Sequence, residues 1–192
     1  MKWRTLALGA ALALALVVAP TASASNSKTG SHPGYGYFGA TSLKVDSGTL
    51  GALGSLGVTP GAVAPGRLEG ATYAFPITNP LGSAIRTGVV RHAGGISLSA
   101  GGTTVKLTDF DIKLRDRLLF GKVNGAGPVA LLDLDYSDTR FKFRWGGIEL
   151  GPVSTTLTQG AATALNQAFG VSAFTDDTVI GKATTRYRIF PF

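Results

Sequence analysis

Apolar and polar residues alternate from residue 71 onward with a period of two, the spacing that turns successive side chains to opposite faces of a β-strand. The alternating stretches are short and are separated by glycine turns at 100–102 and 125–127. Together with TSLKVD, which begins at residue 41, the following stretches predict about nine or ten strands: TYAFPI, AIRTGVVRHA, GISLSA, TTVKLTDFDIKL, RLLFGKVN, PVALLDLDYS, RFKFRW, IELGPVSTTL and IGKATTRYRIF. The pattern therefore predicts a mainly β fold, an antiparallel sandwich or a flattened barrel.

One α-helix is predicted in the C-terminal third, over LTQGAATALNQAFG at residues 157–170. Thr158 can cap its start, an apolar residue recurs at every fourth position from Ala161, and Gly170 can end it in the left-handed conformation. Residues 49–60 carry three glycines and predict one irregular helical turn or a wrapped loop, with Thr49 available as a cap. The following PGAVAPGR, residues 60–67, is typical of turns.

The first 24 residues have the pattern of an export signal, with Lys2 and Arg4 before an apolar run and a small-residue cleavage pattern at 22–24. The apolar run from residue 6 to 19 is shorter than the roughly 20 residues that span a bilayer. We expect a signal peptide at 1–24, a flexible segment at 25–36, and one β-rich domain over 37–192 with no transmembrane segment after cleavage. The mature chain is then secreted, and it stays in the extracellular space or associates with the cell wall.

Charge and composition narrow the chemistry. Without residues 1–24 the chain has 16 basic and 11 acidic residues. Cysteine is absent, which excludes disulfides, thiolate metal sites and cysteine nucleophiles. The two histidines, His32 and His92, are too few for a metal site built on several imidazoles.

The residues do not support a catalytic set. Ser97 lies near His92, but the spacing of a nucleophile elbow is not met because Ser99 stands where that motif needs glycine. Two pairs of carboxylates, Asp109 with Asp111 and Asp133 with Asp135, recur at period two, so each pair is expected to project from one wet face of a strand. The stretch DLDYSD lacks the glycine of a calcium loop, because Asp138 takes its place. We therefore expect a protein that is not an enzyme.

Basic residues alternate with aromatic ones in TRFKFRW, which indicates cations on one face of a strand and rings on the other. This separation and the expected secretion argue against a nucleic-acid partner. A cationic stripe formed with the last strand could instead contact an anionic polymer of the cell envelope. Its residues are Arg140, Lys142, Arg144, Arg186 and Arg188.

Four stretches in the middle of the chain, YAFPIT, GVVRHAGGISL, VKLTDFDIKL and LFGKVNG, together resemble the second half of the Htaa domain. That domain occurs in secreted and cell-wall proteins of actinobacteria that capture haem. The later LTQGAATALNQAFGVSAFTDDTVIGKA is similar to the end segment of many exported actinobacterial proteins whose role is not assigned. The resemblance covers residues 72 to 125, with a looser tail to 185.

The resemblance implies a β-rich haem-binding domain in which a tyrosinate ligates the iron and a histidine supports the tyrosine. His92 matches the histidine position. The family's early Trp-Gly and Phe-x-x-Tyr segment has no counterpart here, which leaves Tyr35, Tyr37 and Tyr73 as the available phenols. A tyrosine oxygen holds ferric haem only after losing its proton, and His92 or Arg91 could stabilise the charge.

Two interpretations stay open for His92. It is part of a ligand site with Tyr73, Tyr37 and Arg91, or it ends a strand and donates to a backbone carbonyl without any chemistry. The predicted function is a non-catalytic binding module, secreted or associated with the cell envelope, for which haem is the implied ligand. The alternative is a structural or polymer-contacting surface protein without a small-molecule ligand.

Overall fold

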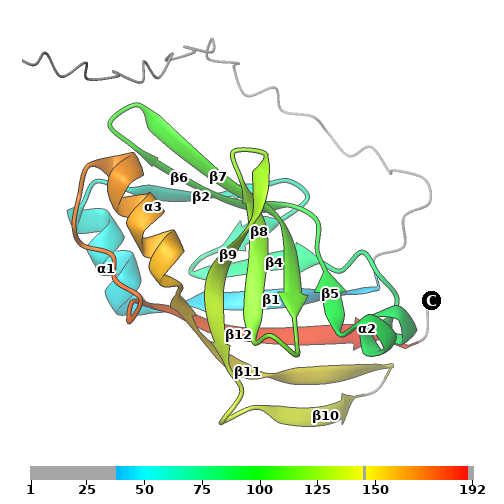
Figure 1. Ribbon diagram of the computed structural model, residues 1–192. Helices are drawn as coiled ribbons and strands as arrows, with labels where there is room; N and C mark the ends of the chain where they lie inside the picture. Colours follow the sequence, from blue (N-terminus) through cyan, green and yellow to red (C-terminus); the bar gives the residue numbers. More distant parts are fainter. Residues whose placement is uncertain (1–37, 145, 190–192) are drawn as a thin grey trace, which may run out of the picture. The chain divides into compact units, whose positions relative to one another are not determined.

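The computed structural model describes residues 38–144 and 146–189, so the predicted signal and the segment at 25–36 lie outside the described residues. The described strands form one twelve-stranded sheet in the order β2-β6-β7-β8-β9-β11-β12-β1-β4-β3, with β5 paired to β7 and β10 to β11. The strand pairs are antiparallel. The sheet curls into a nearly closed barrel (Figure 1), which confirms the predicted fold class. The strands are β1 (Gly39–Val45), β2 (Thr59–Val63), β3 (Arg67–Glu69), β4 (Thr72–Pro76), β5 (Val89–Arg91), β6 (Gly95–Ala100), β7 (Thr103–Lys113), β8 (Leu118–Val123), β9 (Ala126–Asp135), β10 (Arg140–Arg144), β11 (Gly147–Leu157) and β12 (Val179–Arg188).

Three helices accompany the described part of the sheet: α1 (Ser47–Ser55), α2 (Leu81–Thr87) and α3 (Gln159–Phe169). Figure 1 shows α1 and α3 at one end of the barrel and α2 at the other. The predicted helix near the C-terminal third is confirmed as α3, whose Thr158 cap accepts a hydrogen bond from the Ala161 N–H and whose Gly170 is left-handed at φ 65°. Within the described ranges, no helix combines the length and the hydrophobicity needed to cross a bilayer.

The N-terminal helix differs from its prediction, because residues Ser47–Ser55 form a regular helix of about two and a half turns in place of a single irregular turn. Its cap is Asp46, whose carboxylate accepts from the backbone N–H groups of Gly48 and Thr49. Thr49, the expected cap, instead donates its hydroxyl to the carbonyl of Val179. An aspartate cap satisfies two of the free N–H groups in the first turn, and this offsets the glycines that weaken the helix.

The predictions for two segments between β1 and β6 are wrong. AIRTGVVRHA is expected as one strand, but its first half belongs to α2, which begins after Pro80 and ends at Gly88. Proline fixes its own φ at a helix-compatible value, here −66°, and Gly88 ends the helix in the left-handed conformation at φ 71°. PGAVAPGR is expected as turns, yet its first half continues β2, which pairs with β6.

The inward side of β7 changes partway along the strand. Val105 and Leu107 line the barrel interior, and so do Phe110 and Ile112, so the inward positions pass from odd to even numbers. A β-bulge between Thr108 and Asp111 makes this change, with Asp109 in the left-handed region at φ 54°. Asp109 and Asp111 therefore do not share one uninterrupted alternation, in contrast to the prediction from the sequence pattern.

The rings of β10 are not buried, in contrast to the expected in-and-out pattern of a sandwich strand. Phe141 and Phe143 are 56% and 78% exposed, and their rings meet edge to face at 5.1 Å. The reason is topological, because β10 pairs with β11 alone and lies outside the closed path of the sheet. No second layer covers this edge in the described part of the chain.

Candidate functional site

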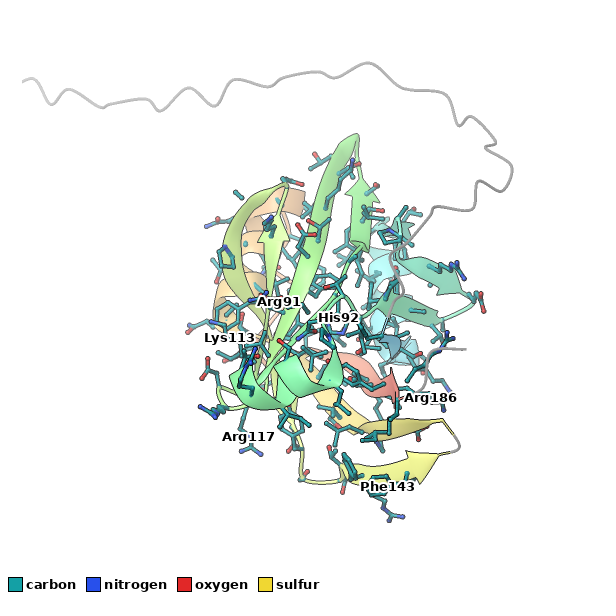
Figure 2. All side chains as sticks on the ribbon, turned by 90° about the vertical axis from the view of Figure 1, so that its right-hand side faces the viewer. Arg91, His92, Lys113, Arg117, Phe143 and Arg186 are labelled. Carbon is teal, nitrogen blue, oxygen red and sulfur yellow. The ribbon has the colours of Figure 1, made fainter. Side chains whose placement is uncertain are left out.

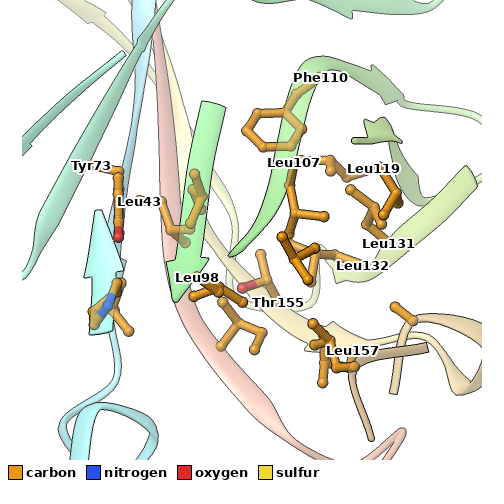
Figure 3. Close-up of a pocket in the computed structure, with 18 of the residues that line it drawn as sticks. Leu43, Tyr73, Leu98, Leu107, Phe110, Leu119, Leu131, Leu132, Thr155 and Leu157 are labelled. Carbon is orange, nitrogen blue, oxygen red and sulfur yellow. The ribbon is translucent and has the colours of Figure 1, made fainter. Parts of the chain in front are cut away.

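A cavity of about 220 Å³ lies inside the barrel at the end that carries α1 and α3. Figure 3 shows Tyr73 and Leu43 on one side and Leu107, Leu131 and Leu132 on the other. The lining is almost entirely aliphatic and aromatic, and none of the described side chains that line it is an aspartate, glutamate, lysine or arginine. Such a cavity suits an apolar guest.

His92 faces this cavity and is 6% exposed. Its Nδ1 lies 3.0 Å from the backbone oxygen of Phe110. Because a carbonyl only accepts, Nδ1 donates, and Nε2 accepts from the hydroxyl of Thr41 at 2.7 Å. The Thr41 oxygen in turn lies 2.9 Å from the hydroxyl of Thr185. Both ring nitrogens therefore have partners, and the geometry matches the expectation that His92 donates to a backbone carbonyl.

Burial lowers the pKa of His92 to about 4, and the hydrogen bond to Phe110 offsets only part of this effect. The imidazole is uncharged at neutral pH, in the tautomer with its proton on Nδ1. A neutral ring whose two nitrogens are occupied cannot supply a positive charge to a nearby phenolate.

Tyr73, on β4, lines the same cavity and is 2% exposed. Its ring stacks on Phe75 with 5.8 Å between centroids, and Phe75 meets Phe110 edge to face. The Tyr73 hydroxyl is buried and has no hydrogen-bond partner. Burial raises the pKa of this phenol, so it is protonated and able to donate.

Arg91, another predicted site residue in the described ranges, is not brought together with His92. Arg91 is exposed on the opposite side of β5, paired in register with Asp111. Arg91 and His92, which are consecutive in the chain, are both labelled in Figure 2. Tyr37 lies outside the described residues. Ser97 is on β6, opposite Gly61 of β2, and does not line the cavity.

A second cavity of about 160 Å³ lies at the other end of the barrel, under α2 and beside β10. Tyr136 and Tyr187 are among its lining residues, and the hydroxyls of both are buried and unpartnered. Burial raises the pKa of both phenols, that of Tyr187 to about 12. Ile112, Leu134 and Ala183 line both cavities, so the two spaces share part of their wall.

The sequence prediction named Tyr73 but missed Tyr136 and Tyr187, although the signal was available. Tyr136 continues the alternation of Leu132 and Leu134, and Tyr187 continues that of Ala183. A tyrosine that extends an inward apolar alternation has to place its hydroxyl in or near the core.

The carboxylate pairs do not form a common site in the structure. Asp109 makes an ion pair with Lys122 at 3.1 Å, and Asp135 accepts from the backbone and hydroxyl of Ser137, which lowers its pKa. Burial raises the pKa of Asp111, which Arg91 and the neighbouring lysines partly oppose. Within the described ranges, no three His, Asp or Glu side chains are grouped to hold a metal ion.

The predicted cationic stripe is partly engaged within the molecule. Arg186 binds Glu149 at 2.5 Å, and Lys142 lies 4.0 Å from the same carboxylate. Arg140 and Arg188 are exposed, whereas the side chain of Arg144 lies outside the described part. Figure 2 labels Arg186 on β12 and Phe143 on β10, and the strand register places these two side chains on opposite faces of the sheet.

Comparison with known proteins finds solved structures with a similar fold. No family model matches the chain, and no curated protein matches it. Among solved structures, the C-terminal domain of HtaA from Corynebacterium glutamicum matches with a TM-score of 0.53 and 14% identity, over 78% of this chain and 95% of that domain. The haem-binding protein HtaB from the same organism matches with a TM-score of 0.50 and 9% identity, over 78% of this chain and 92% of that one. The distant, partial resemblance to the Hta domains is thus confirmed as a likeness of fold.

Proposed function

We propose, from an Hta-like fold that encloses an uncharged cavity, that this protein is a non-catalytic binding module for a hydrophobic molecule. The observation that carries the proposal is the cavity of about 220 Å³ between the barrel wall, α1 and α3. An engineered cavity of about 150 Å³ with an aliphatic lining stays dry and takes up benzene. The interior of this barrel is larger and equally apolar, so it can hold a comparable or larger guest.

The size of the space favours the same function. Packed protein interiors contain few voids larger than a water molecule. A space of about 220 Å³ with an almost entirely apolar lining is therefore better explained by a guest than by imperfect packing.

Haem is the ligand named for HtaB, and the cavity residues do not fit it as an iron ligand set. Tyr73 would have to lose its proton, yet burial raises its pKa and no described cation lines the cavity. His92 has both nitrogens occupied. Haem is also a large planar macrocycle, whereas a cavity of about 220 Å³ suits a smaller guest.

The test is a titration of the purified protein with the neutral dye Nile red, followed by its fluorescence. We expect saturable binding that is lost in Leu98→Trp, since Leu98 is buried on the cavity wall and the larger ring fills the space. Dye binding that persists in Leu98→Trp, in a variant shown by urea unfolding to be folded, contradicts the proposal. Hemin is titrated in parallel, and a Soret band that disappears in both His92→Ala and Tyr73→Phe would restore haem as the ligand.

Export is part of the proposed function and rests on the pattern of residues 1–24. A secreted module should be recovered from the culture medium or the cell wall with an N-terminus near Ser25. N-terminal sequencing of the protein from each fraction tests the export and the cleavage site, and separates secretion into the medium from retention on the wall.

Contact with an anionic envelope polymer is a second candidate function, and the exposed edge at β10 favours it. Phe141 and Phe143 are exposed on one face of this edge, and Arg140 and Arg188 are exposed on its opposite face. Aromatic rings and arginines are enriched at binding surfaces. Sedimentation with purified cell walls should decrease as salt is added and should decrease further in a Phe143→Ser, Arg140→Gln variant. Equal sedimentation of both proteins at all salt concentrations would exclude this edge.

A further inference from the structure

We infer that the guest of the barrel is an uncharged lipid with one hydrogen-bonding oxygen, and that Tyr73 donates to this oxygen. The inference rests on the proposed function, because it assigns a chemical class to the ligand of the same cavity. It follows from two independent observations: the absence of charge along the described wall, and the hydroxyl of Tyr73, a residue of the larger cavity's lining, which has no partner.

The wall excludes a charged guest. No described lysine, arginine, aspartate or glutamate lines either cavity. A carboxylate or ammonium group moved from water into such a space loses its hydration and gains no counter-charge, which costs several kcal/mol or forces the group to become neutral. A fatty-acid anion is therefore a poor guest, whereas an alcohol, ester or ketone with the same chain is a good one.

The polar side chains along the larger cavity are engaged, with the exception of Tyr73. Thr155 donates to the carbonyl of Gly181 at 3.0 Å, and Thr41 and His92 bind one another. The Asn124 amide oxygen accepts from the backbone of Lys106 at 2.8 Å. The Tyr73 hydroxyl has no such partner, although an unpaired buried hydroxyl typically costs about 1–3 kcal/mol. A ligand oxygen that accepts this hydrogen bond removes the cost.

The shape of the interior indicates a chain. The two cavities follow one another along the barrel and share side chains such as Ile112 and Leu134 in their walls. A flexible alkyl chain can reach past such side chains, whereas a rigid ring system of the same volume cannot. Tyr73 then binds the polar end in the larger cavity, and the tail extends toward Tyr187 at the end covered by α2.

The experiment compares two probes that share a chain and differ in charge, decanol and decanoate, as competitors of bound Nile red. At pH 7 a carboxylic acid with an ordinary pKa of about 4.3 is protonated in about one molecule in 500. We expect the apparent affinity of decanol, measured by displacement of the dye, to be on the order of 100-fold higher than that of decanoate. The apparent affinity for decanoate should rise about tenfold per unit as the pH falls from 8 to 7, while that for decanol stays constant.

The role of Tyr73 is tested with Tyr73→Phe and with Tyr136→Phe as the matched control in the smaller cavity. Tyr73→Phe should weaken competition by decanol by about 2- to 10-fold and leave competition by decane, which has no oxygen, unchanged, because one hydrogen bond is lost and the apolar space is retained. Tyr136→Phe should leave both unchanged. Urea unfolding checks that the variants are folded, which we expect because each substitution removes only an unpartnered hydroxyl.

The outcomes separate the two proposals. If Nile red does not bind inside the barrel, the proposed function fails and the assignment of a ligand class fails with it. If the dye binds but decanol and decanoate compete equally at pH 7, the inference of an uncharged guest is wrong. An unchanged affinity of Tyr73→Phe for decanol shows that the hydroxyl is not the partner and overturns its assignment.

Discussion

At the scale of single residues, His92 shows how the barrel uses a titratable side chain in its core. Both ring nitrogens are satisfied in the neutral imidazole, because Nε2 accepts from Thr41 while Nδ1 donates to Phe110. In the charged form the Thr41 hydroxyl can turn to accept from Nε2 and donate to Thr185, but the added charge stays buried in a site without a described counter-charge. The residue therefore stabilises the fold in one protonation state and destabilises it in the other.

The first prediction follows from the pKa of His92, about 4 in the folded protein against 6.5 when unperturbed. Between these values the unfolded chain binds a proton that the native state does not. The stability from a neutral His92 is thus complete above pH 6.5 and is lost as the pH falls toward 4, by about 3 kcal/mol in total. Urea unfolding at several pH values should show that the free energy of unfolding of the natural protein decreases as the pH falls from 6.5 toward 4. The same measurement on His92→Gln should show a much smaller decrease.

The comparison with His92→Gln isolates the imidazole. Asp111 and the other carboxylates titrate in both proteins, and burial raises the pKa of Asp111, which acts with the opposite sign as the pH falls. Their contribution cancels in the difference between the two curves. Parallel curves for the two proteins would show that His92 is not buried as a neutral ring.

Tyr73 and His92 also show what the sequence could say of the site. Both are candidates from the sequence alone, and both line the cavity. Arg91, the neighbour of His92 in the chain, faces away because alternation in β5 sends it outward. The partner of His92 could not be predicted, since Thr41 is 51 positions away and meets it only when the barrel closes.

At the scale of elements, glycines have two different functions that composition alone does not distinguish. A Cβ at Gly94 would lie 2.2 Å from the backbone nitrogen of Gly66, and φ at Gly94 is +85°. This glycine allows the turn before β6 to touch the loop between β2 and β3. A Cβ at Gly54 in α1 would meet nothing within 4 Å beyond its own helix, so this glycine serves no contact.

The second prediction contrasts these two positions. Gly94→Ala should destabilise the protein by about 3 kcal/mol or more, because the methyl group collides with backbone and the conformation is strained. Gly54→Ala should stabilise it by about 0.5–1 kcal/mol, since alanine is the better helix former. Urea unfolding measures both, and a neutral Gly94→Ala would mean that the turn and the loop are not in contact.

The third prediction concerns the aromatic residues of the sheet. Phe143→Ser on β10 should change the free energy of unfolding by less than about 0.5 kcal/mol, because the ring is 78% exposed. Phe110→Ala on β7 should cost about 3–5 kcal/mol, because that ring is buried against Phe75. Chemical denaturation of the two variants tests whether β10 lies outside the closed path of the sheet, since the sequence pattern alone predicts both rings in the core.

The strands were largely predictable, and their irregularities were not. Period-two alternation identified β4 and the strands from β6 onward because their inward faces are apolar. It could not locate the bulge at Asp109, since a bulge changes the parity of the pattern without changing its composition. It also missed α2, a helix of seven residues whose apolar face carries Leu81, Ala84 and Ile85 and which is followed directly by the apolar strand β5.

At the scale of the whole molecule, the fold was predictable as a class and its interior volume was not. Short antiparallel strands without room for crossover helices exclude a parallel sheet. Whether a barrel is filled or hollow depends on how closely side chains such as Leu98 and Leu131 approach one another, and this is a property of the closed structure.

The fourth prediction links the interior to global stability. Decanol at 100 times its dissociation constant should stabilise the folded state by about 2.7 kcal/mol. For a chain of this size that corresponds to an increase of about 5–10 °C in Tm. Calorimetry of the natural protein should show this shift, and Leu98→Trp, with its cavity filled, should show none. An equal shift in both proteins would indicate that the alcohol binds outside the barrel.

The two ends of the strand order have a consequence for exchange with solvent. Among the described strands, β2 and β3 end that order and no ladder joins them, although only residues 64–66 separate them in the chain. Widening the wall at this seam breaks no hydrogen bond between strands, whereas opening any ladder breaks several. Breathing of the native state should therefore concentrate there, and amide protons of the short β3 should exchange with deuterium faster than those of β11 and β12.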